Sequence, residues 1–157
     1  YLSSNKEREN IVLYNPKKNF LFTKKILKRA RNTNLLFAPL IGKTQDELLE
    51  IYRKAKIYMD FGTFPGAERI PKEAVFNGCL IITGRNGAAD NNKDVPIPSE
   101  FKIPSKEENI DKIIDKLIYM EENFDALTPM FKEYRDRVGS LEDDFVRALP
   151  FLFDIKH

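Results

Sequence analysis

The chain is predicted to adopt an α/β fold built on an open parallel sheet. Short apolar runs alternate along it with longer amphipathic segments, and a polar or glycine-bearing loop follows nearly every apolar run. This alternation is typical of strand–helix–strand units, whose parallel sheet carries helices on both faces. Ligands of such sheets bind beyond the carboxyl ends of the strands. We therefore expect a Rossmann-like sheet with its binding loops along one edge, and C-terminal helices appended to it.

The predicted strands are short, apolar and free of proline until their last residues. Helices are expected between them, and local signals mark their ends: residues 44–47 (Thr-Gln-Asp-Glu) form a capping box, and Gly78 is placed to stop a short helix that contains Pro71 in its first turn. The strands are predicted at residues 10–14, 35–40, 57–61 and 79–83, and the helices at 20–31, from 44 onward and at 71–77.

The last third of the chain is predicted to be mainly helical. Residues 101–103 are read as a short edge strand, and Ser105 opens a second capping box before a helix with regularly spaced isoleucines. Residues 128–157 are predicted to be C-terminal helices, with one starting at Thr128, ending at Gly139 and followed by another that Pro150 interrupts. Residues 1–9 are polar and expected to be poorly ordered. The whole chain, 1–157, is read as a single domain.

Composition excludes several classes of protein. The formal net charge of +2 gives no reason to expect a nucleic-acid partner, and a single cysteine excludes an internal disulfide and fits a reducing compartment, so a cytoplasmic location is expected. No run is long enough for a membrane span, and no His/Cys cluster or Asp-x-Asp pair indicates a metal site. The start at Tyr1, without methionine, suggests a piece of a longer protein.

The segment from the third to the fourth strand carries the clearest motif. Residues 73–82 read Glu-Ala-Val-Phe-Asn-Gly-Cys-Leu-Ile-Ile. They resemble the second half of the Glu-x7-Glu pattern of retaining GT-B glycosyltransferases, in which the second glutamate is followed by a small residue and then Gly-x-Pro-Val-Ile. Glu73 takes the place of the second glutamate, and Pro65 stands where the first would be. The chain therefore resembles the C-terminal, nucleotide-binding half of these enzymes.

This resemblance implies a function as well as a fold. It implies a donor domain that binds a nucleoside-diphosphate sugar in an enzyme of polysaccharide biosynthesis, with no cofactor and no metal. The half that binds the acceptor is missing, so this chain alone is expected to bind nucleotide weakly and to turn nothing over. Any peripheral membrane association would come through that missing half. The donor base and sugar, the acceptor, retention or inversion, and oligomeric state stay open.

Residues of the loop after the first strand are the first site candidates. In the resembled family this loop holds an arginine and, further on, a lysine, both on the donor phosphates. Lys18 falls at the position of that lysine, whereas Leu13 occupies that of the arginine. Asn15 and Lys17 belong to the same loop. The alternative is that Lys17 and Lys18 are merely solvated, as most surface lysines are.

The later loops supply the other candidates for the nucleotide sugar. Arg69 precedes a helix start, where anions are favoured, and its planar fork suits a diphosphate. Glu73 is expected either to complement the helix dipole from the first turn or to accept hydrogen bonds from a ribose diol, and the resemblance favours the second role. Arg85 is a second phosphate or sugar contact, or part of an Asn-Gly turn. The remaining candidates are Gly62, Gly66, Glu68 and Ile70, and Glu68 with Arg69 can also be read as an exposed loop pair.

Two other functions remain open. One is a nucleotide-sugar epimerase of the same fold, and the other is a non-catalytic α/β module that uses the same surface for a protein partner. The absent first glutamate and arginine favour the module. The triplet Asp60-Phe61-Gly62 also occurs in protein kinases, but no glycine-rich loop or His-Arg-Asp segment accompanies it, so it is read as a chance match.

Overall fold

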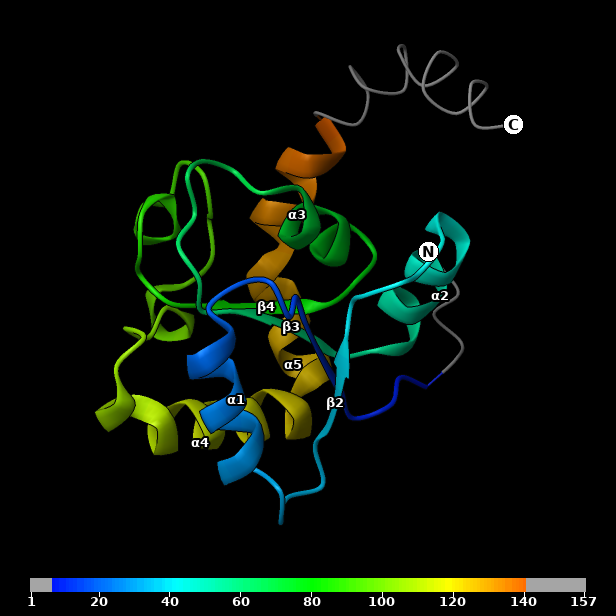
Figure 1. Cartoon of the computed structure of the whole chain (residues 1–157). Helices are drawn as coiled ribbons and strands as arrows, with labels where there is room; N and C mark the ends of the chain where they lie inside the picture. The colour runs from blue at the N-terminus through cyan, green and yellow to red at the C-terminus, as the bar shows by residue number, and fades with distance from the viewer. Residues whose placement is uncertain (1–6, 141–157) are drawn as a thin grey trace.

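The computed structural model describes residues 7–140, and its sheet has the predicted architecture. The strands β1 (Ile11–Tyr14), β2 (Leu36–Pro39), β3 (Ile57–Asp60) and β4 (Leu80–Thr83) form one sheet in the order β2-β1-β3-β4. Every neighbouring pair is parallel (Figure 1). The α/β prediction is confirmed, and all the loops that follow the strands therefore leave from the same edge.

Burial follows the position of each strand in the sheet. All residues of β3 and β4 are buried and so are the first three of β1, whereas β2 at the edge has none buried and exposes Leu36. Parallel strands covered on both faces need continuous apolar side chains, and this is why these runs lack polar alternation. The core continues from the strands into α4 and the segment that follows it.

Helices cover both faces of the sheet, as predicted. Figure 1 shows α1 (Phe20–Arg29) and α4 (Ile110–Glu122) on one face and α3 (Arg69–Phe76) on the other. α1 and α4 pack together, and an Arg29–Asp111 ion pair (2.6 Å) joins them, while a Lys25–Glu107 pair (2.9 Å) joins α1 to the 3₁₀ turn before α4. The other helical elements within residues 7–140 are α2 (Gln45–Lys54), α5 (Phe124–Leu127), the helical residues 132–140 and 3₁₀ turns at Ala88–Asp90, Ser99–Phe101, Glu107–Asn109 and Thr128–Phe131.

The predicted helix ends at Thr44 and Gly78 are confirmed, and the one at Ser105 is wrong. Thr44 and Glu47 form the capping box of α2, and Gly78 takes a positive φ of 101° just beyond α3. The capping box at Ser105 does not form: the residue before α4 is Asn109, without a side-chain cap. The Ser105 hydroxyl instead donates to the carbonyl of Phe61, 2.9 Å away. The Ser105 hydroxyl therefore bonds to a carbonyl that is distant in the sequence, and not to the helix end that the local pattern predicted.

The position of Glu73 also differs from the prediction. α3 begins at Arg69, so Pro71 lies in the first turn, as predicted, but Glu73 is the fifth residue and no acidic residue lies in the first turn. The helix dipole acts mainly within that turn. Complementing the dipole is therefore no explanation for this glutamate.

The C-terminal part matches the prediction only in outline. Residues 101–103 make a single bridge between Lys102 and Thr83 rather than a strand. The helical segment predicted from Thr128 starts earlier, with α5, and continues through 132–140, so Gly139 lies inside it. Gly139 packs against the ring of Phe76, where a side chain would be 3.6 Å from the ring. The helix predicted after Ser140 and its break at Pro150 lie outside the described residues.

The described part of the N-terminal stretch contacts the helices through Arg8. Residues 1–6 lie outside the described part, but Arg8 donates hydrogen bonds to three backbone carbonyls, those of Tyr52, Ala55 and Asn77. The Arg8 guanidinium thus joins the ends of two helices, while the order of residues 1–9 stays a prediction. No helix within residues 7–140 is long and apolar enough to cross a membrane.

Candidate functional site

Three loops meet at the carboxyl edge of the sheet, which is defined here by residues 15–19, 62–70 and 84–90. The first two are joined by Lys18, whose ammonium group donates to the Thr63 carbonyl at 3.0 Å. The second and third are joined by a parallel bridge between Phe64 and Gly87. The predicted meeting of these loops is thus confirmed by direct contacts.

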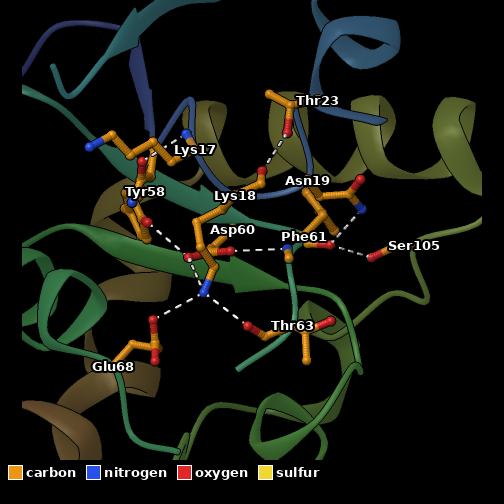
Figure 2. A network of polar contacts seen from close by, with 12 residues as sticks. Lys17, Lys18, Asn19, Thr23, Tyr58, Asp60, Phe61, Thr63, Glu68 and Ser105 are labelled. Atoms are coloured by element: carbon orange, nitrogen blue, oxygen red, sulfur yellow. Dashed lines mark hydrogen bonds and ion pairs between the residues drawn. The ribbon is translucent and has the colours of Figure 1, made fainter. Parts of the chain in front are cut away.

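The ammonium group of Lys18 is the centre of a polar network (Figure 2). It lies 3.0 Å from a carboxylate oxygen of Glu68 and 3.9 Å from one of Asp60, in addition to the Thr63 carbonyl. Its side chain is 18% exposed, so it is not the freely solvated lysine of the alternative reading. Lys17, by contrast, is exposed, and its side chain extends away from this network in Figure 2.

The path of the Lys18 side chain depends on its neighbours in the second loop. A side chain at Gly62 would come within 2.8 Å of the Lys18 Cε atom, so glycine leaves the space through which the lysine passes. Beyond it, the ammonium group lies 4.7 Å from the centre of the Phe64 ring, a cation–π contact. Gly62, a predicted site residue, therefore affects the position of the Lys18 side chain.

Asp60 was missed as a site residue, because its triplet was read as a chance match. It ends β3 and is 4% exposed, and its carboxylate accepts from the Tyr58 hydroxyl at 2.9 Å and the Gly62 amide at 3.0 Å. Burial raises the pKa of the Asp60 carboxyl, while the Gly62 amide and then Lys18 oppose the rise. The signal available in the sequence was an acid at the carboxyl end of an otherwise apolar strand.

Asn19 was also missed, although it lies in a predicted loop. It precedes α1 in the left-handed conformation, with φ 47° and ψ 57°, and its amide donates to the Phe61 carbonyl at 3.0 Å. Asparagine tolerates this conformation better than most residues. Its hydrogen bond fixes the first loop against the second and so helps to hold Lys18 in place.

Glu73 lies beside two partners on the face formed by α2 and α3. One carboxylate oxygen accepts from the Tyr52 hydroxyl at 3.0 Å, and the other lies 3.2 Å from the Arg69 Nε atom. The Glu73 side chain is 24% exposed and that of Arg69 is 71% exposed. Burial and then the Glu73 carboxylate raise the pKa of Tyr52, which keeps its hydroxyl protonated as a donor. The predicted loop pair of Glu68 with Arg69 is not formed.

Arg85 bonds to one group in its own loop and to one in a later segment. Its guanidinium lies 2.7 Å from the Asp90 carboxylate and 3.2 Å from the Ser99 carbonyl. Gly87, which follows, has a φ of 67°, and a side chain there would collide with the Phe64 backbone. The structure therefore shows Arg85 paired within the protein, while a phosphate or sugar contact from Arg85 stays a prediction.

The remaining candidates have simple surroundings. Asn15 accepts a hydrogen bond from the Lys17 amide at 2.9 Å, which shapes the turn after β1. Gly66 has open space where a side chain would project, and Ile70 is half-buried against the core. Two shallow surface hollows lie along α2 and between residues 32–35 and α4, away from these loops.

The chemistry available here is that of paired cations and carboxylates. Within residues 7–140 no group of three or more His, Cys, Asp or Glu could hold a metal ion. A cation paired with a carboxylate can bind another anion, such as a phosphate, in its place. A carboxylate such as that of Glu73 can accept hydrogen bonds from hydroxyl groups. That the site works without metal stays a prediction.

Comparison with known proteins supports the fold. No protein-family model matches the chain, and neither does any curated protein. A solved structure does: the catalytic domain of starch synthase IV from Arabidopsis thaliana bound to ADP and acarbose, with a TM-score of 0.56 and 13% sequence identity. The match covers 93% of this chain but only 40% of that one. The predicted resemblance to the nucleotide-binding half of a GT-B glycosyltransferase is thereby confirmed at the level of the fold.

Proposed function

We propose that this domain binds the diphosphate of a nucleoside-diphosphate sugar and forms the donor half of a glycosyltransferase. The observation that carries the proposal is the position of Lys18: a partly buried cation at the carboxyl ends of parallel strands, held between two loops. Ligands of open α/β sheets bind at this edge. The match to a glycosyltransferase catalytic domain supports the proposal through the fold.

The roles follow from the contacts of each residue. Lys18 would contact a phosphate, with Arg69 as the more exposed second cation. Glu73 would accept hydrogen bonds from the ribose diol, because an ionised carboxylate has lone pairs beyond those that Tyr52 and Arg69 occupy. Cations aimed at the departing diphosphate would lower the barrier to sugar transfer by stabilising the charge that develops there.

A second domain would have to supply the acceptor. The chain spans 40% of the length of the starch synthase domain that it matches. We propose that a further α/β unit faces the carboxyl edge in the working enzyme, as in the GT-B architecture. The isolated chain is then expected to bind nucleoside diphosphates at millimolar concentration and to transfer no sugar.

A nuclear magnetic resonance titration tests the proposal. Uridine, guanosine or adenosine diphosphate should shift amide signals of residues 15–19, 66–73 and 84–87. Lys18→Met should weaken binding by about 1.5–3 kcal/mol, the usual value of a charged hydrogen bond. Lys56→Met is the matched control, because Lys56 is equally exposed (17%) and is also paired with a glutamate, at the opposite edge of the sheet. Shifts confined to other surfaces, or equal losses in both variants, would contradict the proposal.

The non-catalytic interaction module is a second candidate, and one observation favours it. The described cations of the carboxyl edge are almost all neutralised: Lys18 pairs with Glu68 and Asp60, Arg69 with Glu73, and Arg85 with Asp90. A charge-balanced surface suits a protein partner better than a phosphate. The same titration separates the two functions, because a module of this kind does not bind nucleoside diphosphates and its amide signals should not shift.

A further inference from the structure

Lys18 has two kinds of partner at the carboxyl edge. The Thr63 carbonyl belongs to the backbone, and Asp60 is 4% exposed and held by the Tyr58 hydroxyl and the Gly62 amide. Neither can leave without disturbing the end of β3. The position of the ammonium group therefore does not depend on Glu68.

Glu68 is the partner that can move. Its side chain is 26% exposed, and it lies in the loop before α3 rather than in a strand. The described contacts of its carboxylate are with the Lys18 ammonium group at 3.0 Å. Although it directly precedes the helix, its side chain makes no hydrogen bond to the helix end. A rotation of this side chain would therefore break one ion pair and little else.

A cation held by fixed contacts with a movable carboxylate on it has the features of an anion-exchange site. Phosphate oxygens and carboxylate oxygens make the same charged hydrogen bonds to an ammonium group. The two groups repel each other at close range, so both cannot approach Lys18 without cost. An incoming diphosphate has to replace the Glu68 carboxylate.

We propose that Glu68 is the internal counter-ion of Lys18, which the diphosphate displaces, so that Glu68 weakens nucleotide binding at the carboxyl edge. This inference rests on the proposed function, and it assigns Glu68 a role opposite to that of a ligand contact. It also accounts for a charge-balanced surface that nevertheless binds an anion. In the empty site Glu68 keeps the partly buried ammonium group paired, and it swings into solvent when the ligand arrives.

The test is a substitution that should improve binding. Glu68→Gln removes the competing charge and keeps the size of the side chain, so the affinity for adenosine diphosphate should rise roughly fivefold, as the upper value of a partly exposed ion pair indicates. Calorimetry or the nuclear magnetic resonance titration on the 157-residue chain measures it. Glu121→Gln is the matched control, since Glu121 is 16% exposed and pairs with Lys56 at 3.2 Å on the other edge.

The outcomes separate this inference from the function on which it rests. Tighter binding in Glu68→Gln, with Glu121→Gln unchanged, supports it. Unchanged or weaker binding in Glu68→Gln, with clear binding by the unsubstituted chain, overturns it and leaves the proposed function standing. Equal tightening in both variants also overturns it, because the effect is then one of net charge. Absence of binding in the unsubstituted chain and in both variants, at millimolar nucleotide, overturns the inference and the function together.

Discussion

Arg8 at the amino edge of the sheet and Lys18 at its carboxyl edge are both paired cations, but with different kinds of partner. At the amino edge, Arg8 bonds to the backbone carbonyls that end α2 and α3, at 2.7–2.8 Å. At the carboxyl edge, Lys18 and Arg69 meet the side-chain carboxylates of Glu68 and Glu73. A backbone carbonyl cannot leave its cation without unwinding a helix end, whereas a side-chain carboxylate can rotate away.

This difference separates a structural cation from one suited to a ligand. The last carbonyls of a helix have no partner within it, and Arg8 supplies one for two helices at once. These backbone carbonyls cannot be exchanged for a phosphate. At the carboxyl edge each acid occupies a place that an anionic ligand could take. Substitutions at the amino edge should therefore change stability, and those at the carboxyl edge should change binding.

The largest effect is expected at Arg8. Arg8→Ala should lower the free energy of unfolding by about 4 kcal/mol, because several charged hydrogen bonds are lost and their carbonyls are left without partners. Urea denaturation measures the change. Arg53→Ala is the control, since Arg53 is exposed and its bond within residues 7–140 is to the Asn77 side chain, at 3.3 Å; its loss should cost no more than about 0.5 kcal/mol. Similar losses in the two variants would remove the contrast between the edges.

The next effect concerns binding through Glu73. Glu73→Gln should weaken binding of a ribonucleoside diphosphate by about 1.5–3 kcal/mol, because a charged hydrogen bond to the ribose is lost. A 2′,3′-dideoxy nucleotide should bind both forms almost alike. Calorimetry on the protein change and the ligand change together gives the coupling between them. Additive losses would show that Glu73 does not contact the ribose hydroxyls.

A smaller effect is expected at Gly78, beside Arg8. Gly78→Ala should cost about 1–2 kcal/mol, because φ is 101° there and a side chain would meet the Arg8 guanidinium. Gly66→Ala at the carboxyl edge is the control: it has open space and no positive φ, so stability should stay the same or rise slightly. Thermal unfolding compares the two, and an equal loss at Gly66 would contradict the expectation.

The smallest expected effect concerns the reactivity of the Cys79 thiol, at the amino edge. Burial raises the pKa of its thiol to about 12, so the thiol stays protonated at pH 8. Since the thiolate is the reactive form, a thiol reagent should not modify the folded protein at this pH and should react fully in urea. Rapid modification of the folded protein would show that the amino edge opens more easily than the carbonyl contacts of Arg8 indicate.

Local patterns in the sequence were enough for most of the fold. The strands follow from continuous apolar runs, the start of α2 from the capping box at Thr44, and the end of α3 from Gly78. Each of these signals depends on residues within a few positions of one another. Parallel pairing then follows from the alternation of strands and helices. The resemblance around Glu73 added the class of fold that the comparison supports.

Tertiary structure alone decided which polar groups meet. Lys18 and Glu68 are 50 residues apart, and Arg8 and Asn77 are 69 apart, so no local pattern could pair them. Ser105 was predicted to cap a helix, but its hydroxyl bonds to a carbonyl in another segment. Asp60 was interpreted as part of a chance match, but its carboxylate lies beside Lys18. A polar side chain bonds to whatever the packed backbone places within about 3 Å of it, and the packing of distant segments determines that set of neighbours.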